Sequence, residues 1–267
     1  MIRTALGLVG VALLAALTIA LMPHLEAGTG GGHLNAAQST PVLVELFTSE
    51  GCSDCPPADT LLGKLDKSQP VTGADIVVLS EHVDYWDEIG WKDPYSLHEF
   101  TERQGAYASR FRLRSIYTPQ MVVDGRTELV GSDERGAIEA IQNAAKTEKL
   151  PVTLSAIHFD GSNAIALHVE TAALPSDVSE SVNVLVAIAD DSDESHVSRG
   201  ENAGRTLHHV AVVRTLVLVG TEEKGSNFSK DTRIHFNGGN SRNVRLVALA
   251  QDKSGRIWGV GSARLPN

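Results

Sequence analysis

The only two cysteines of the 267-residue chain lie three positions apart, where the sequence changes from a strand pattern to a helix pattern. Before them, PVLVELFTS (Pro41 to Ser49) is a compact apolar run with β-branched residues, which predicts a buried strand. After them, PPADTLLGKLDKS spaces its leucines along one helix face, and its two prolines suit a first helical turn. Cys52 and Cys55 are therefore expected at a strand-to-helix junction.

A redox role explains this cysteine pair better than a structural bridge does. Any intramolecular disulfide must join Cys52 to Cys55, and so short a loop removes little chain entropy from the unfolded state. The first N–H groups and the dipole of a helix favour negative charge, so the pKa of Cys52 should lie below that of a free cysteine. The Cys52 thiolate would attack a disulfide, and Cys55, one turn on and more buried, would resolve the mixed disulfide.

Two acids beside the cysteines predict a moderate rather than a strong oxidant. Glu50 precedes the pair, and Asp54 lies between the two cysteines. A carboxylate opposes a neighbouring thiolate electrostatically, whereas strongly oxidising disulfide enzymes stabilise theirs. We therefore expect a pair that is less oxidising than those enzymes. A Cys52 pKa measured below about 5 would count against this expectation.

Strands and helices alternate up to about residue 149. Ala74 to Trp86 supplies a second apolar strand, and the segment after it is amphipathic enough for one or two helices. A hairpin follows, with QMVV and TELV as arms around Asp124-Gly125, and then a helix that Ser132 or Asp133 can cap. Beyond residue 150, short alternating stretches separated by Gly, Asn and Asp turns predict a β-sandwich.

The order strand, C-x-x-C, helix, strand, helix, two strands and helix resembles the thioredoxin superfamily. Four motifs narrow the resemblance to an exported bacterial thioredoxin-like family of largely unassigned function: ELFTSEGCSDCPPAD, EHVDYWDEIGWKDPYS, YTPQMVVDG and RGENAGRTLHHVAVVRTL. The resemblance implies an α/β thioredoxin-like domain over residues 38–149, with a central mixed sheet flanked by helices. An all-β sandwich-like domain would follow over residues 150–267. The W-C-G-P-C of true thioredoxins is absent, so general disulfide reductase activity does not follow.

The YTPQ motif predicts a docking segment for the partner. In this topology a proline directly before the third strand normally lies against the C-x-x-C. We therefore expect a cis Thr118–Pro119 bond that exposes the backbone of Thr118 for pairing with a peptide or a mixed-disulfide partner. The alternative is a trans proline that merely opens a strand.

The stretch EHVDYWDEIGWKDPYS places His82, Asp84 and Trp86 at the carboxyl end of the second strand, beside the cysteines. These residues are packed loop residues, or a wall that faces the substrate and tunes the thiols, or part of a metal site. Cys52, Cys55 and His82 together would suit Cu(I), or zinc with a fourth ligand. Exported copper chaperones of the Sco type, however, space their cysteines C-x-x-x-C.

A second polar stretch, RGENAGRTLHHVAVVRTL (Arg199 to Leu216), lies far along the chain. Side chains alternate across a strand, so His208 and His209 should point to opposite faces and would not easily chelate one ion. We interpret the stretch as a buried polar network that joins the two domains or fixes a loop. The alternative is a binding surface near the thiols.

The N-terminus indicates export. Arg3 is followed by an uncharged apolar run from Ala5 to Met22, and residues 1–37 are expected to be a signal peptide or an uncleaved anchor plus a flexible spacer. The protein would then be periplasmic or secreted, or anchored in the inner membrane facing the periplasm. The net charge of −10 argues against nucleic acid as a partner.

The sequence therefore predicts an exported thiol–disulfide oxidoreductase with Cys52 and Cys55 as catalytic residues and Thr118 and Pro119 as docking residues. The partner would be a protein or small-molecule thiol or disulfide, and no cofactor is expected. A membrane contact would come only through an uncleaved N-terminal segment. Two alternatives remain open at this point: a periplasmic copper-binding protein or metallochaperone, and a non-catalytic binding module whose bridge locks the loop.

Overall fold

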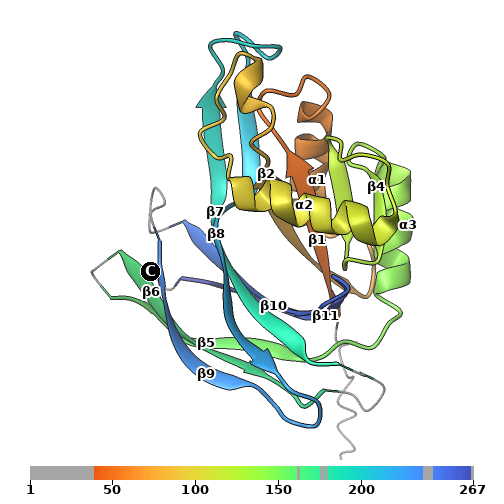
Figure 1. Cartoon of the computed structure of the whole chain (residues 1–267), viewed down its shortest axis with the longest axis vertical. Coiled ribbons are helices and arrows are strands. Elements are labelled where there is room, and N and C mark those ends of the chain that lie inside the picture. The colour runs from red at the N-terminus through yellow and green to blue at the C-terminus, as the bar shows by residue number, and fades with distance from the viewer. Residues whose placement is uncertain (1–38, 161–162, 175–177, 179, 237–242, 266–267) are drawn as a thin grey trace, which may run out of the picture. The chain divides into compact units, whose positions relative to one another are not determined.

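The structure is a computed structural model that describes residues 39–160, 163–174, 178, 180–236 and 243–265. Strands account for 46% of the described residues and helices for 19%. The elements, shown in Figure 1, are β1 (Thr40–Thr48), α1 (Pro56–Ser68), β2 (Ala74–His82), the 3-10 helix η1 (Asp87–Ile89), α2 (His98–Phe111), β3 (Gln120–Val123), β4 (Thr127–Val130), α3 (Glu134–Ala144), β5 (Val152–Phe159), β6 (Ala164–Thr171), β7 (Val182–His196), β8 (Thr206–Glu222), β9 (Ser229–His235), β10 (Val244–Asp252) and β11 (Ile257–Arg264).

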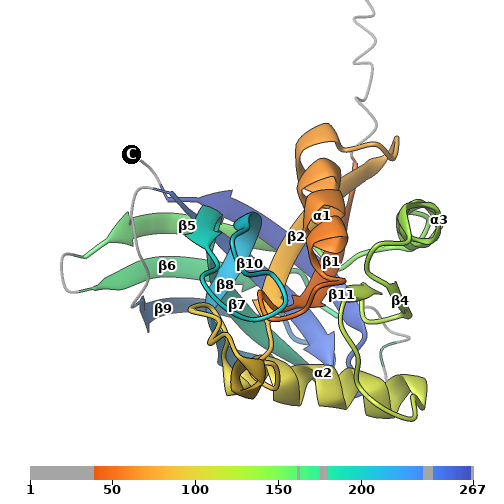
Figure 2. The ribbon, with the colours of Figure 1, turned by 90° about the horizontal axis from the view of Figure 1, so that it is seen from above.

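Strand β1 is covered on both faces because its apolar residues do not alternate with polar ones. Val42, Val44 and Leu46 pack in one core with the apolar residues of α1 and α3. Leu43 and Phe47, on the other face, pack with α2 and with residues of β10 and β11. Figure 2 shows α1 and α3 on one side of this part of the sheet and α2 on the other. A strand buried on both faces is read from sequence as a continuous apolar run, as it was here.

One eight-stranded sheet runs through both halves of the chain, in the order β11-β10-β7-β8-β2-β1-β3-β4. Strands β1 and β2 are parallel, and β3 and β4 pair antiparallel beside β1. The two halves join where Ser80 of β2 pairs in parallel with Val212 of β8. The hairpin β7–β8 is long. The first part of β7 pairs with β10, and the end of the hairpin that contains the turn runs beside β2 towards the cysteines.

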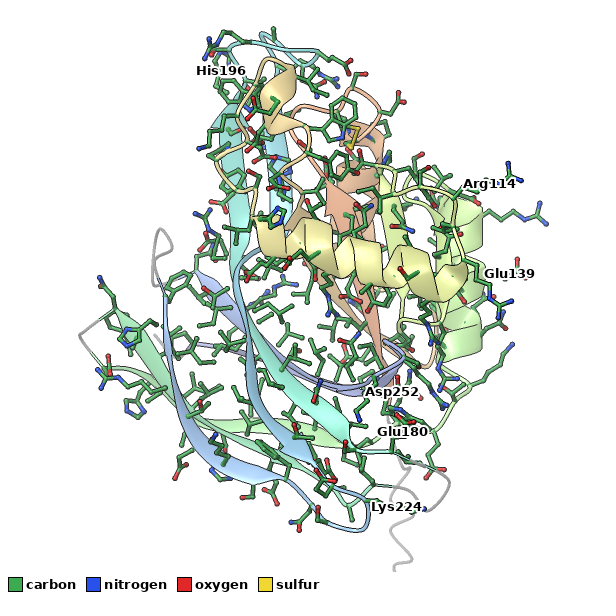
Figure 3. All side chains as sticks on the ribbon, viewed as in Figure 1. Arg114, Glu139, Glu180, His196, Lys224 and Asp252 are labelled. Carbon is green, nitrogen blue, oxygen red and sulfur yellow. A yellow bond between two sulfur atoms is a disulfide. The ribbon has the colours of Figure 1, made fainter. Side chains whose placement is uncertain are left out.

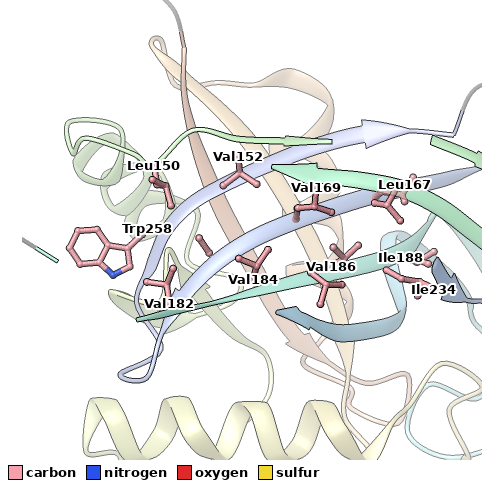
Figure 4. Packing of buried hydrophobic residues seen from close by; sticks show 14 of the residues in the cluster. Leu150, Val152, Leu167, Val169, Val182, Val184, Val186, Ile188, Ile234 and Trp258 are labelled. Carbon is pink, nitrogen blue, oxygen red and sulfur yellow. The ribbon is translucent and has the colours of Figure 1, made fainter. Parts of the chain in front are cut away.

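The remaining strands form a three-stranded sheet, β5-β6-β9, that packs on the C-terminal half of the large sheet. The core between them is built from alternate residues of β6, β7 and β10, among them Val169, Val184 and Leu246, and it includes Trp258 of β11 (Figure 4). Gly259 and Gly261 of β11 allow the backbone around the start of β5 to approach closely. A Cβ at Gly259 would lie 2.1 Å from the carbonyl oxygen of Leu150, and one at Gly261 would lie 2.2 Å from that of Val152.

The predicted fold class is therefore wrong. In a helix-flanked thioredoxin-like domain followed by a separate all-β sandwich, the sheet of the first domain would pair with no strand of the second domain. Instead, β7, β8, β10 and β11 from the second half continue the sheet that β1 to β4 begin, and the structure is mostly strand with three α-helices in its described part. The sequence pattern identified strands in both halves but did not show which strands pair with which.

Several local predictions are confirmed. Helix α1 begins at Pro56, directly after the cysteines, and Asp133 caps α3 by accepting a hydrogen bond from the Gly136 N–H at 3.0 Å. The turn between β3 and β4 contains Asp124 and Gly125, both with positive φ. No helix within the described ranges is long and apolar enough to cross a bilayer. The predicted signal or anchor, residues 1–37, lies outside the residues that the structure describes.

Candidate functional site

The two cysteines form a disulfide at the junction between β1 and α1. Their Cα atoms lie 5.4 Å apart, and Cys55 is the N-cap residue of α1, so the pair is at the positive end of the helix dipole. Figure 3 shows the disulfide in yellow at the same end of the structure as His196, the last residue of β7. Cys52 is 1% exposed and Cys55 is 0% exposed, so the expected difference in burial is absent in the disulfide form.

The turn between β7 and β8 holds the backbone of the cysteine segment in place. Asn202, which is fully buried, donates from its side-chain amide to the carbonyl oxygens of Glu50 at 2.8 Å and Cys52 at 2.9 Å. The carboxylate of Glu201 accepts a hydrogen bond from the Ser53 N–H at 3.1 Å. These contacts agree with the interpretation of this polar stretch as a network that fixes a loop, and the loop is the one that carries the cysteines.

The carboxylate of Glu50 is buried just before the cysteines and has three partners. Its Oε2 accepts a hydrogen bond from the indole N–H of Trp91 at 2.7 Å, and its Oε1 accepts one from the hydroxyl of Ser195. The same Oε1 lies 3.3 Å from Nε2 of His209. Glu50 is therefore held by residues from β7, β8 and the loop after β2, and it does not point freely at the disulfide.

His209 lies between two carboxylates that flank the cysteines in the sequence. One is Glu50, and the other is Asp59 on α1, one helical turn beyond Cys55, whose Oδ1 is 3.9 Å from His209 Nδ1. Burial opposes protonation of the ring, but Asp59 and Glu50 raise the pKa of His209 to about 10. The ring is therefore positive at neutral pH. It offsets part of the negative charge that the sequence analysis placed beside a Cys52 thiolate.

A second buried histidine packs against the first. His82 ends β2, and its Nδ1 lies 2.7 Å from Asp93 Oδ2, which also accepts the Glu50 N–H at 2.8 Å. Burial favours the neutral form of Asp93, yet the charge and hydrogen bond of His82 lower the pKa of Asp93. The rings of His82 and His209 meet edge to face at a centroid distance of 4.7 Å. We call Glu50, Asp59, His82, Asp93 and His209 the histidine cluster.

Three buried polar atoms of the histidine cluster have no hydrogen-bond partner among the described residues: Nε2 of His82, Nδ1 of His209 and Oδ1 of Asp59. Buried polar atoms in folded proteins are almost always bonded, and an unsatisfied one costs about 1–3 kcal/mol. Two of the three atoms, Nδ1 of His209 and Oδ1 of Asp59, face each other at 3.9 Å, which is too far for a hydrogen bond.

The predicted docking segment lies beside the cysteines and is linked to them by Trp86. The Thr118–Pro119 bond is cis, as expected from the sequence. The indole N–H of Trp86 donates to the Thr118 hydroxyl at 2.8 Å. The Cβ of Trp86 would lie only 3.1 Å from a Cβ added at Gly51, so Trp86 also packs on the residue before Cys52.

Pro119 is placed near the start of α1 by a close approach at Gly131. A Cβ added there would lie 3.0 Å from the Cβ of Pro119 and 3.1 Å from the Cβ of Ala58, which is in the first turn of α1. Cys52, Cys55, Trp86, Thr118 and Pro119 are thus brought together. They come from three segments of the first half of the chain.

Two further predicted tuning residues, Asp84 and Asp54, lie outside the histidine cluster, as Trp86 does. Asp84 accepts a hydrogen bond from the Thr101 hydroxyl at 2.6 Å and lies 2.9 Å from His98 Nδ1. Both partners lie in the first turn of α2, so Asp84 binds the start of that helix. Burial acts against its ionisation, but these two hydrogen bonds lower the pKa of Asp84. Asp54 is exposed between the cysteines and makes none of the contacts described for Glu50.

The alternative metal site at Cys52, Cys55 and His82 is not assembled in this disulfide form. The two sulfurs are bonded to each other, so neither is a thiolate ligand here. Nowhere in the described part of the chain are three His, Cys, Asp or Glu side chains arranged to hold a metal ion.

Sequence reasoning missed the roles of Asp59, Asn202 and His209 in this site. The alternation rule did separate the two adjacent histidines, since the side chain of His208 is 72% exposed and that of His209 is fully buried. No local pattern indicated that the buried one faces α1, because β8 reaches the cysteines only through its pairing with β2. Asp59 looked like an ordinary acid in a first helical turn.

Comparison with known proteins gives a family and several solved structures of similar fold, among them the following two. A crystal structure of protein AGR_C_4864 from Agrobacterium tumefaciens is 28% identical, with a TM-score of 0.65, over 86% of this chain and 96% of that chain. HBP35 of Porphyromonas gingivalis, at 12% identity and a TM-score of 0.63, covers 85% of this chain and 76% of its own, and shows a likeness of fold alone. No functionally curated protein matches the chain.

A family model described as a protein of unknown function, DUF1223, matches residues 43–251. The match begins inside β1 and ends in β10, so it covers the cysteine segment, the docking segment and the β7–β8 turn. This chain, with its disulfide and its histidine cluster, belongs to the DUF1223 family.

Proposed function

We propose that this protein is an exported thiol–disulfide exchange protein that acts through the Cys52–Cys55 pair. The observation that carries the proposal is a disulfide between residues three apart, placed at the N-terminus of α1. A 15-residue loop gives about 3 kcal/mol of stabilisation in the chain-entropy model, and a shorter loop gives less. Stability alone is a weak reason for this bridge. Export rests on the N-terminal segment, residues 1–37, outside the described residues.

The reaction needs a partner that carries thiols. A partner thiolate attacks Sγ of Cys52, the S–S bond breaks, and the electron pair leaves on Sγ of Cys55, which takes up a proton. A second partner thiol, as its thiolate, attacks the mixed disulfide and releases Cys52, which also takes up a proton. The partner dithiol loses two electrons and two protons and becomes a disulfide, while this protein becomes a dithiol. The reverse sequence of steps reduces a partner disulfide.

The surroundings support exchange at Cys52 with controlled access. The backbone of the cysteine segment is fixed by Asn202 and Glu201, so both redox forms can keep one backbone conformation. Because Cys52 is only 1% exposed, a partner must displace a covering group first. Trp86 is the candidate cover, since it packs on Gly51 and is tethered to Thr118 by one hydrogen bond.

The test is exchange with a synthetic peptide that carries two cysteines. Oxidised protein is mixed with the reduced peptide, quenched with acid, alkylated and analysed by mass spectrometry. We expect oxidation of the peptide by the wild type and none by Cys52→Ser. Cys55→Ser, charged as its Cys52 mixed disulfide with glutathione, should release glutathione to the attacking peptide thiol, and the second peptide thiol should then release Cys52 and form the peptide disulfide. With a peptide that carries a single cysteine, the same variant should stop at the mixed disulfide between the peptide and Cys52.

Ser53→Ala is the matched control, because it changes the exposed residue between the cysteines and leaves both sulfurs in place. It should exchange like the wild type. Wild-type protein that oxidises the peptide no faster than glutathione disulfide does at the same concentration would contradict the proposed function.

A further inference from the structure

The histidine cluster places one cation between two acids that bracket the cysteines. Glu50 lies two positions before Cys52, and Asp59 lies four positions after Cys55, with its N–H donating to the Cys55 carbonyl at 3.1 Å. Their shared partner, His209, comes from β8, far along the chain. The two acids and the ring are all buried, so solvent screens them little.

We propose that His209 is the positioning residue that sets the ionisation of the Cys52 thiol, by holding a positive charge between Glu50 and Asp59. The inference rests on the proposed function, because it concerns the thiol that would attack the partner. His209 acts through the two acids and does not itself react.

The proposal depends on charge, so every charged or titratable neighbour of His209 matters. His82 and Tyr95 meet its ring, at centroid distances of 4.7 and 5.8 Å, and Arg214 lies over the ring of Tyr95. Burial and then Asp193 raise the pKa of Tyr95, so that ring stays neutral. Asp193 of β7 is the strand partner of His209 and is attracted to it. The groups that face His209 are Glu50, Asp59, His82, Tyr95 and Asp193.

The sign of the effect follows from this arrangement. With His209 protonated, Glu50 and Asp59 together carry one uncompensated negative charge. Loss of the histidine charge leaves two negative charges near the thiol and disfavours the thiolate, whereas loss of one acid leaves none and favours it. Two variants should therefore shift the Cys52 pKa in opposite directions, which a purely structural role for His209 would not produce.

The test is the pH dependence of Cys52 alkylation by iodoacetamide in the reduced full chain, followed by mass spectrometry. We expect His209→Gln to raise the Cys52 pKa by about one unit, which leaves about tenfold less thiolate, and Asp59→Asn to lower it by about one unit. The double variant should return to within about half a unit of the wild type. His208→Gln is the matched control, because His208 is the exposed neighbour on the same strand.

Shifts of the same sign in His209→Gln and Asp59→Asn would overturn the proposal, as would an equal shift in His208→Gln. If His209→Gln does not fold, the Cys52 pKa in Asp59→Asn is the test. A value in that variant equal to or above that of the wild type contradicts the proposal. The measurement needs no partner protein. Failure of peptide exchange with these shifts intact would therefore remove the proposed function and leave the role of His209 standing.

Discussion

Two carboxylates near the first strand are buried five positions apart and are balanced by different cations. Glu45 of β1 is bound by Arg103 of α2 through Nε at 2.7 Å and Nη2 at 2.5 Å, and it accepts the Tyr107 hydroxyl at 2.7 Å. Glu50, just beyond the same strand, faces His209 of β8 at 3.3 Å. Arg103 donates two N–H groups to the same oxygen of Glu45, Oε1, whereas His209 leaves one ring nitrogen without a hydrogen bond among the described residues.

Arg103 and His209 differ in whether their charge can change with pH. Burial works against the Arg103 cation, but Glu45 raises the pKa of Arg103 further above its already high value. That charge is permanent, and it ties α2 to β1 and, through Gln251 at 2.9 Å, to β10. The charge of His209 is conditional, because its pKa is about 10. The permanent charge of Arg103 fits a residue that stabilises the fold, and the pH-dependent charge of His209 fits a residue of a reactive site.

The largest effect should come from removing the permanent charge. Arg103→Gln leaves Glu45 and Glu81 buried without their cation, and the free energy of unfolding should fall by about 3–5 kcal/mol in urea titrations. Lys64→Gln is the control, because it breaks the Lys64–Glu134 surface pair, whose side chains are each 55% exposed. That loss should stay below about 1 kcal/mol. If both variants lost the same free energy of unfolding, Arg103 would not be a stabilising residue of the fold.

The conditional charge should appear as a dependence of stability on pH. The folded-state pKa of His209 is raised from 6.5 to about 10, so its stabilisation is complete below about pH 6.5 and is lost as the pH rises towards 10. Between pH 7.5 and 9 the slope from this group should approach about 1.4 kcal/mol per pH unit. Urea unfolding of the wild type and His209→Gln should differ by that slope, and identical slopes would contradict the raised pKa.

Asn202 tests whether the β7–β8 turn fixes the cysteine segment. Asn202→Ala removes the donors to the carbonyl oxygens of Glu50 and Cys52, and the free energy of unfolding should fall by about 1–3 kcal/mol. Asn143→Ala, an exposed site on α3, is the control and should change stability little. Comparable values for the two variants would mean that the turn does not hold the segment.

Trp86 tests access to the disulfide, and we expect the smallest change in free energy there. Trp86→Ala removes the cover over Gly51, so dithiothreitol should reduce the disulfide about tenfold faster, as when local opening becomes about 1.4 kcal/mol easier. Ile89→Ala, at an exposed site on the neighbouring η1, should react like the wild type. If Trp86→Ala left the rate of disulfide reduction unchanged, Trp86 would not be the group that covers the disulfide.

The parts of the structure that depend on neighbouring residues could be predicted from the sequence. The apolar run before Cys52, the prolines at the start of α1 and the Asp124-Gly125 turn each carry their structure in neighbouring residues, and all three were predicted correctly. The junction of disulfide and helix followed from the same short-range signals.

The long-range half could not be read in the same way. The single register pair Ser80–Val212 joins the two halves of the large sheet, and no local pattern specifies a pairing between segments so far apart. That pairing brings His209 and Asn202 to the cysteines, so the fold class and the charge balance of the site were misjudged together. Glu50 was treated as an acid without a counter-ion because its cationic partner, His209, belongs to the other half of the chain.

The reduction potential of the Cys52–Cys55 pair decides whether this disulfide can take part in exchange. Purified protein is equilibrated with defined ratios of reduced and oxidised glutathione, or of dithiothreitol for lower potentials, and the fraction of dithiol is measured after alkylation. The account predicts a value between about −120 and −270 mV, the range of proteins that exchange disulfides. A value below about −300 mV, in the range of inert structural bridges, would contradict it.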